Sequence, residues 1–255
     1  MSNIKSAFNN KKCFVGFLTA GDPSLEKTKE YILAMEKAGA DIIEIGIPFS
    51  DPIAEGPVIQ EANVRALKNG CTLPKIFDMV ADLRKETQVP LVFLTYANPV
   101  FNYGYDAFCK KCREVGIDGM IIPDVPYEES MELREYTDKY NLDLIRLIAP
   151  TSKERIASLA KDATGYIYLV SSMGVTGMRD SIKTAIDDLV DEIKKCTDTP
   201  VAVGFGIHTR EQVEEYQQIA DGVIVGSAIV NIIAEHGENA APEISKFIRS
   251  MTGKE

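Results

Sequence analysis

The chain has 255 residues, of which 45% are apolar and 26% are charged, a composition typical of a folded globular protein and not of a disordered one. The formal net charge of −10 argues against nucleic acid as the main partner, because binding a phosphate backbone needs clusters of Lys and Arg. No segment approaches the length of apolar sequence that spans a membrane, and the start MSNIKSAFNNKK lacks the apolar segment of a secretory signal. Five cysteines, an odd number, without signs of secretion predict reduced thiols and a cytoplasmic protein.

Short apolar runs alternate with longer amphipathic segments along the whole chain. In chain order, the runs that we predict to be strands are residues 13–19, 41–47, 91–96, 118–122, 143–148, 166–171, 201–204 and 221–225. Most of them are apolar at successive positions, which is the pattern of parallel strands covered on both faces. Helical spacing fills the gaps, as at Tyr31, Met35 and Ala38.

Eight strand–helix units in about 250 residues fit a (β/α)₈ barrel. The sequence therefore predicts an α/β fold, with a single TIM-barrel domain over residues 1–255, an eight-stranded parallel core and an extra N-terminal helix. The rival architecture is a doubly wound open sheet, which should carry a glycine fingerprint after its first strand. Here the first strand continues into TAGDPS, residues 19–24, which has no such fingerprint.

Glycines follow the last two predicted strands, at the end of a barrel where function resides. Residues 204–209 read GFGIHT, and Gly226 and Ser227 open the helix after the eighth strand. Glycine lets backbone N–H groups approach a ligand, and helix N-termini favour anions. Because barrels often bind phosphate after strands seven and eight, this pattern favours a phosphate site, although tight turns use glycine as well.

Glu44 lies inside the apolar run of the second predicted strand. Alternation places it on the face opposite Ile43 and Ile45, so its carboxyl is expected to point into the barrel. A buried carboxyl is either paired or has a raised pKa, and a raised pKa suits a group that exchanges protons near neutrality. The alternative is a structural ion pair at a strand end. The next loop adds Asp51 and Glu55, which could reach the same ligand from above or simply face solvent.

The other residue types limit the classes of reaction that the protein could catalyse. The two histidines, His208 and His236, form no cluster with metal-ligand spacing. No lysine lies in a predicted strand, which disfavours a Schiff-base aldolase, and neither a G-x-S-x-G nor a Walker motif is present. With these reactions disfavoured, the residues point to acid–base catalysis by carboxylates on a phosphorylated organic substrate. Apolar side chains near strand ends could form a slot for an aromatic ring or belong to the core: Phe17, Leu94, Tyr96, Tyr168 and Phe205.

Seven ordered segments resemble the alpha subunit of tryptophan synthase along nearly the whole chain. They read FLTAGDP (17–23), IEIGIPFSDPIAEGPVIQEANVRAL (43–67), TYANPVFNYG (95–104), GIDGMIIPDVPYEE (116–129), YLVSSMGVTGMR (168–179), GFGI (204–207) and GVIVGSAIV (222–230). The resemblance implies a carbon–carbon lyase of L-tryptophan biosynthesis that reversibly cleaves indole-3-glycerol phosphate to indole and glyceraldehyde 3-phosphate. It also implies that no cofactor or metal is needed, and that the chain docks on a beta subunit in an alpha2beta2 complex.

The resemblance further implies roles for individual residues. Glu44 would move a proton between the glycerol hydroxyl and indole C3, and Glu55 would hydrogen-bond the indole N–H. The phosphate would rest on the backbone around Gly177, Gly206, Gly226 and Ser227. The indole would be surrounded by Phe17, Leu94, Ile121, Tyr168, Phe205 and, from the loop that closes the site, Thr176. The surface facing the beta subunit would include Pro48, Asp51, Asn98 and Pro126.

Two departures from the family pattern leave alternatives open. The usual A-D-G-P reads Ala54-Glu55-Gly56-Pro57 here, and a misplacement of about 1 Å can cost roughly 100-fold in rate. Ser172-Met173 replaces an Arg-containing pair before the closing loop. The chain could therefore be a catalytically weakened allosteric partner of the beta subunit, or a stand-alone indole-releasing lyase. Another phosphate-binding barrel, such as an isomerase of the same pathway, is disfavoured by the apolar slot without catalytic lysines.

Overall fold

The computed structural model describes residues 3–9, 11–170, 179–204 and 206–254, apart from the side chains of residues 153–154 and 179–184. Its strands all run parallel and are β1 (Cys13–Thr19), β2 (Ile42–Gly46), β3 (Leu91–Leu94), β4 (Gly119–Ile121), β5 (Asp143–Leu144), β6 (Arg146–Ile148), β7 (Ile167–Val170), β8 (Val201–Gly204) and β9 (Gly222–Val225). Their order in the sheet is β5-β4-β3-β2-β1-β9-β8-β7-β6.

The sheet closes through its two edges. β5 and β6 are separated by Ile145 alone, and they pair with β4 and β7 respectively. Together they form the fifth predicted strand, broken at one residue, so the strands β1 to β9 correspond to the eight predicted from the sequence. Since the two edges are consecutive in the chain, the sheet curves into a barrel, and the predicted (β/α)₈ architecture is confirmed.

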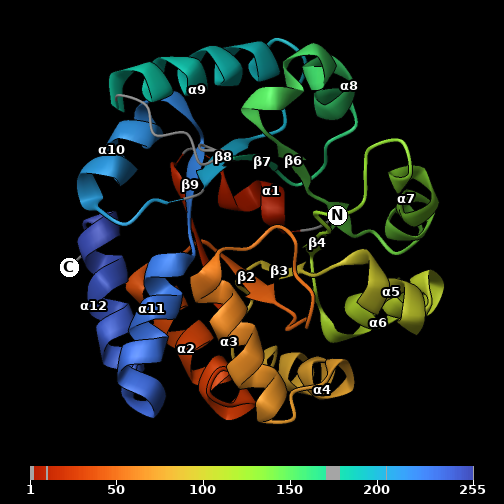
Figure 1. Ribbon diagram of the computed structural model, residues 1–255, viewed down its shortest axis with the longest axis vertical. Coiled ribbons are helices and arrows are strands. Elements are labelled where there is room, and N and C mark those ends of the chain that lie inside the picture. Colours follow the sequence, from red (N-terminus) through yellow and green to blue (C-terminus); the bar gives the residue numbers. More distant parts are fainter. Residues whose placement is uncertain (1–2, 10, 171–178, 205, 255) are drawn as a thin grey trace.

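All the helices except α1 surround the barrel on its outside, whereas α1 lies over one end of it (Figure 1). The helices are α1 (Ile4–Ala7), α2 (Leu25–Ala38), α3 (Pro57–Lys68), α4 (Leu73–Leu83), α5 (Ala97–Tyr103), α6 (Tyr105–Val115), α7 (Ser130–Lys139), α8 (Ile156–Lys161), α9 (Arg179–Lys194), α10 (Arg210–Ile219), α11 (Ser227–His236) and α12 (Ala241–Thr252), with short 3₁₀ helices η1 (Pro150–Arg155) and η2 (Gly237–Asn239). Among these described helices, none combines the length and the apolar character needed to cross a membrane.

Alternation along the strands separates an inner from an outer layer. On β2, Ile42 packs in an inner cluster with Val15 of β1, whereas Ile43 and Ile45 pack in the large outer cluster beneath the helices. Glu44 therefore lies on the inner side of the barrel, as its position between two outward-facing isoleucines predicts.

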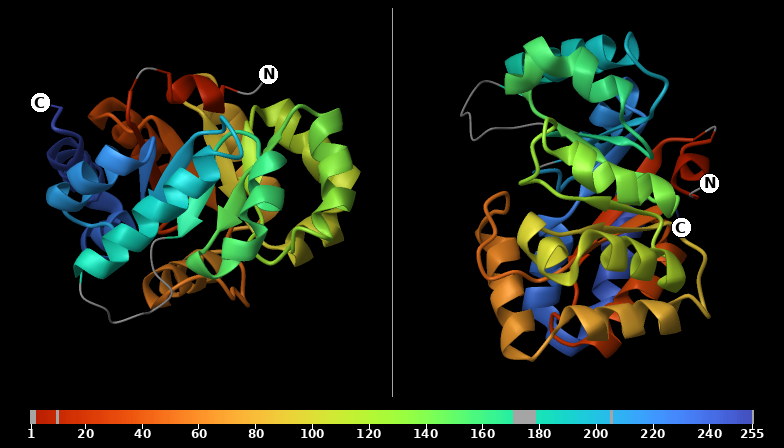
Figure 2. Two further views of the ribbon diagram at one scale, coloured as in Figure 1. Left: turned by 90° about the horizontal axis from the view of Figure 1, so that it is seen from above. Right: turned by 90° about the vertical axis from the view of Figure 1, so that its right-hand side faces the viewer.

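Helix α1 closes one end of the barrel, and this confirms the predicted extra N-terminal helix. Ile4 is fully buried and Phe8 nearly so, and both belong to the inner cluster. Gly119 and Gly222 make room for them, because a Cβ at these positions would lie 2.9 Å from Ile4 and 3.1 Å from Phe8. The two views of Figure 2 place α1 opposite the loop that leads into α3. The mouth at the carboxyl ends of the strands is therefore the end that the loops line.

Candidate active site

A buried carboxyl lies at the centre of the barrel. Glu44 pairs in register with Phe17 of β1 and Val92 of β3, and it is 1% exposed. Its Oε1 accepts a hydrogen bond from the Tyr166 hydroxyl. Burial raises the pKa of Glu44 to about 7, although the hydrogen bond from Tyr166 acts in the opposite direction. The carboxyl can thus be neutral or charged near neutral pH, as a group that both donates and accepts protons requires.

Tyr166, the hydrogen-bond partner of Glu44, is a functional residue that the sequence pattern alone does not single out. Tyr166 comes directly before β7, and both Tyr166 and Tyr168 contribute to the inner cluster. In the order of the strands β7 lies across the barrel from β2, which carries Glu44. Burial raises the pKa of Tyr166 well above its usual value, so its hydroxyl remains a donor at neutral pH. The signal that could have found it was its spacing of two residues from Tyr168.

Glu55 is held in a defined position by hydrogen bonds. Asn63 of α3 donates from Nδ2 to Glu55 Oε2 at 2.7 Å, and Gln60 Nε2 donates to the Glu55 carbonyl at 2.8 Å. The Tyr96 hydroxyl accepts from the Ala54 amide at 3.2 Å and also hydrogen-bonds with the Glu55 carboxyl. Burial raises the pKa of Glu55, while its bonds to Asn63 and Tyr96 oppose the rise. This is a positioned carboxyl and not a freely solvated loop acid.

An aromatic side chain connects the two acids. Phe17, which is 3% exposed, packs against Ala62 of α3, the residue next to Asn63. On its other side Phe17 is in register with Glu44. Gly46 at the end of β2 makes room for the ring, because an added Cβ would lie 2.7 Å from Phe17 Cζ. Glu44 and the Glu55–Asn63 pair therefore flank one apolar wall.

A second aromatic side chain stands on the opposite strands. Tyr168 of β7 is half-buried and packs on the inner cluster. Gly204 at the end of β8 leaves space for it, since a Cβ there would lie 2.6 Å from the Tyr168 hydroxyl. Leu94 and Ile121 occupy paired positions on β3 and β4 between the two aromatic residues, and they belong to or pack against the same cluster. The mouth side of the barrel thus has apolar walls from four strands.

Backbone groups at the ends of β8 and β9 face the same region. Gly226 caps the N-terminus of α11, and a Cβ added there would lie 3.4 Å from Phe17, so this helix begins beside the aromatic wall. Ser227 is its exposed first residue. Gly206 has a φ of 80° and nothing within 4 Å of an added Cβ. The free N–H groups of a helix start and an open glycine turn suit an anionic ligand group.

A family model described as tryptophan synthase alpha chain matches residues 2–254. The chain belongs to the tryptophan synthase alpha chain family. The alpha chain of Lacticaseibacillus casei is 50% identical over 98% of this chain and 94% of its own length. That of Lactiplantibacillus plantarum is 51% identical over 98% and 95%.

Solved structures agree with this assignment. The tryptophan synthase alpha subunit from Legionella pneumophila superposes with a TM-score of 0.91 at 36% identity, covering 99% of this chain and 98% of that one. A chain from the a2b2 complex of tryptophan synthase from Pyrococcus furiosus gives a TM-score of 0.88 at 38% identity, covering 94% and 98%.

The structure brings together most of the positions that resemblance to a tryptophan synthase alpha chain predicts. Those that meet at the barrel mouth are Glu44, Glu55, Phe17, Leu94, Ile121, Tyr168, Gly206, Gly226 and Ser227. The predictions for Thr176, Gly177 and Phe205 lie outside the described residues. Of the predicted partner-facing residues, Asp51, Asn98 and Pro126 are exposed, but Pro48 is buried within the chain itself. Pro48 comes two residues after the end of β2 and directly after the buried Ile47, so its side chain is covered and does not form part of the exposed surface.

Proposed function

We propose that this tryptophan synthase alpha chain is a cofactor-independent carbon–carbon lyase, which reversibly cleaves indole-3-glycerol phosphate to indole and glyceraldehyde 3-phosphate in cytoplasmic L-tryptophan biosynthesis. One domain over residues 1–255 carries the whole reaction. The observation that supports this most strongly is the buried Glu44, whose pKa is raised to about 7, beside an apolar wall that also adjoins the positioned carboxyl of Glu55.

The two carboxyls supply the two charge movements that the cleavage needs. Neutral Glu44 gives its proton to indole C3, and the positive charge that develops on the ring nitrogen is stabilised by the Glu55 carboxylate, which accepts the N–H hydrogen bond. The bond from C3 to the glycerol chain then breaks, and its electron pair returns to the ring. The glycerol hydroxyl becomes the aldehyde and passes its proton to Glu44, which is neutral again.

Backbone amides anchor the other end of the substrate. The start of α11 at Gly226 and Ser227, together with the turn at Gly206, would hold the phosphate through N–H groups. Binding energy from this remote group orients the reacting carbon between the acids. The indole lies against Phe17 and Tyr168 in the same proposal.

A beta subunit is the proposed partner, in an alpha2beta2 complex like the a2b2 complex of Pyrococcus furiosus. Asp51 and Pro126 are exposed in loops after β2 and β4, and Asn98 is exposed on α5. Two large apolar side chains are also exposed in these segments, Ile53 at 78% in the loop after β2 and Phe101 at 68% on α5. Exposed apolar groups beside polar ones are typical of a protein interface.

The assay that tests the proposed function measures indole release from indole-3-glycerol phosphate, by the chain alone and with a beta subunit added. We expect release that increases when the beta subunit is present. Fast release that the partner does not change would support a stand-alone lyase. If no indole is released in either case while the beta reaction is stimulated, the chain is instead an allosteric partner with lost catalysis.

The pH dependence of this reaction should report on Glu44. Because the neutral carboxyl is the acid, and because its pKa lies at about 7, kcat/KM is expected to fall as the pH rises through that value. Replacing Tyr166 with Phe removes the hydrogen bond that lowers the pKa of Glu44, so the falling limb should move to higher pH. Steady-state rates across the pH range check this. An identical limb in both proteins would show that Glu44 is not the titrating acid.

A further inference from the structure

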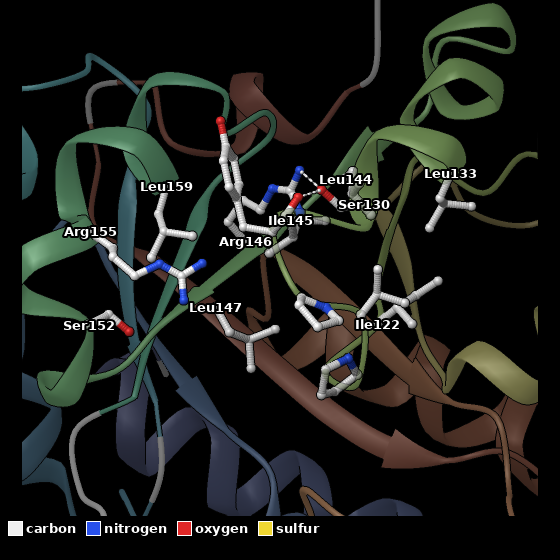
Figure 3. Close-up of a pocket in the computed structure, with 14 residues that line it drawn as sticks. Ile122, Ser130, Leu133, Leu144, Ile145, Arg146, Leu147, Ser152, Arg155 and Leu159 are labelled. Atoms are coloured by element: carbon white, nitrogen blue, oxygen red, sulfur yellow. Dashed lines mark hydrogen bonds between the residues drawn. The ribbon is translucent and has the colours of Figure 1, made fainter.

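A cavity lies beside the barrel, between α7 and the segment formed by η1 and α8 (Figure 3). It has a volume of about 190 Å³. Leucines form much of its wall, among them Leu133, Leu144 and Leu159, while Arg146 and Arg155 reach it from β6 and η1. Its lining therefore combines apolar surface with positive charge. It adjoins the barrel mouth, because Pro126 and the inward-facing Ile145 and Leu147 also line it.

Arg146 is a buried cation whose hydrogen bonding is incomplete. The residue is 7% exposed, and its Nη2 donates to Ser130 Oγ at 2.7 Å. Its buried Nε finds no acceptor among the described residues, and no described carboxylate forms an ion pair with it. The Tyr127 ring lies 5.3 Å from Cζ. Burial lowers the pKa of Arg146, but a guanidinium stays charged in proteins, so the wall of the cavity carries a positive charge without a carboxylate partner among the described residues.

Arg84 shows how this chain satisfies a guanidinium in a comparable position. Its side chain is 14% exposed, and it donates to the Asp118 carboxylate at 2.8 Å. It also donates to the carbonyl oxygens of Gly116 at 2.8 Å and Val89 at 2.6 Å. Arg146 has no comparable set of acceptors within the described part of the chain. An anion entering the pocket would complete it.

We propose that this pocket binds a small organic acid, whose carboxylate pairs with Arg146 and whose apolar body packs against the leucines. A planar carboxylate matches the donor fork of a guanidinium, and the apolar walls favour a ligand with a hydrocarbon part over an inorganic anion. Arg155 already pairs with Glu128 at the surface, so it contributes less than Arg146. Arg146 is not one of the residues proposed to carry out indole-3-glycerol phosphate cleavage, because it alternates with the inward-facing Ile145 and Leu147 and so lies on the outer face of β6.

The melting temperatures of two variants distinguish a ligand-binding role of Arg146 from a role in stabilising the fold. Replacing a buried cation that lacks a partner by an apolar residue of similar size is commonly neutral or stabilising, whereas breaking a complete buried ion pair is strongly destabilising. Without ligand, Arg146→Met should therefore leave the melting temperature unchanged or raise it. Arg84→Met should lower it, because Asp118 would lose its cation. A marked fall in melting temperature for Arg146→Met would show that this arginine stabilises the fold and is not kept for a ligand.

The binding test uses the full chain, with benzoate as the probe. Benzyl alcohol serves as its neutral counterpart and inorganic phosphate as the purely anionic one. Benzoate should shift the ¹⁵N resonance of Arg146 Nε and leave that of Arg84 in place. Its affinity by calorimetry should fall about 10- to 100-fold in Arg146→Met, the range expected for hydrogen bonds to a charged group. Equal benzoate affinity in the variant, equal binding of benzyl alcohol, or a shift with phosphate but none with benzoate would each overturn the proposal.

Discussion

Replacing Glu44 with Gln is expected to lower kcat for indole-3-glycerol phosphate cleavage by about 10²- to 10⁴-fold, the usual contribution of a positioned general acid–base. Glutamine keeps an oxygen that can accept the hydrogen bond from Tyr166, but it has no proton to give to indole C3 and cannot take one from the glycerol hydroxyl. The measurement is indole release in the presence of a beta subunit, with circular dichroism as the check that the fold is retained. Turnover within a few-fold of the unchanged chain would remove Glu44 from the mechanism.

Glu44→Gln should also change how the free energy of unfolding depends on pH, and this can be measured without an activity assay. The folded-state pKa of Glu44 is raised from 4.5 to about 7 by burial, so the stability that the proton contributes is fully present below pH 4.5 and is lost as the pH rises through 7. The glutamine of the variant does not titrate. The free energy of unfolding of Glu44→Gln, relative to the native chain, should therefore rise by about 3 kcal/mol between pH 4.5 and pH 8. Denaturant unfolding at the two pH values measures this. A pH-independent difference would mean that the carboxyl is not held neutral by burial.

Replacing Glu55 with Gln is expected to lower kcat by about 10²- to 10³-fold, as removal of a single group that stabilises transition-state charge commonly does. The introduced glutamine would preserve the size of the side chain and a contact with Asn63, so the loss would come from the missing negative charge near the ring nitrogen. Single-turnover cleavage measures the chemical step. A rate close to that of the native chain would place Glu55 outside the reaction.

Glu55→Asp is the companion variant, since it restores the residue usual in the family. The shorter side chain keeps the charge but withdraws from Asn63, whose Nδ2 lies 2.7 Å from Glu55 Oε2. We expect a loss of about 10-fold, smaller than that of Glu55→Gln, because a displacement of about 1 Å costs up to roughly 100-fold. An unchanged or higher rate would show that the native glutamate is a tolerated variant and that its bond to Asn63 is not needed.

Most of the barrel could be predicted because parallel strands buried on both faces are apolar at every position, and helices with regular spacing separate them. The fifth predicted strand shows what the apolar pattern does not predict. The sequence predicts one strand over residues 143–148, yet Arg146 lies within it, and the structure breaks the strand at Ile145. An arginine within an otherwise apolar strand is a visible sign of a position that does not belong to the apolar core, and its side chain lines the cavity beside α7.

The site was predictable only where a local pattern carries the geometry. Alternation around Glu44 fixed the face of its side chain, and therefore its burial and the direction of its pKa shift. The identity of its partner was not accessible in this way, because Tyr166 lies 122 positions further along the chain and closure of the barrel brings the two together. Asn63 is close in sequence to Glu55, but no turn or capping pattern marks its contact with a carboxyl eight residues earlier.

The most direct test is a crystal structure of the chain with an indole-3-alkyl phosphate that lacks the glycerol hydroxyls and so cannot be cleaved. We predict the indole ring against Phe17 and Tyr168, C3 within hydrogen-bonding reach of the Glu44 carboxyl, and the phosphate on the amides at Gly206 and Gly226. An analogue bound with C3 turned away from Glu44, or with its phosphate remote from those amides, would contradict the mechanism.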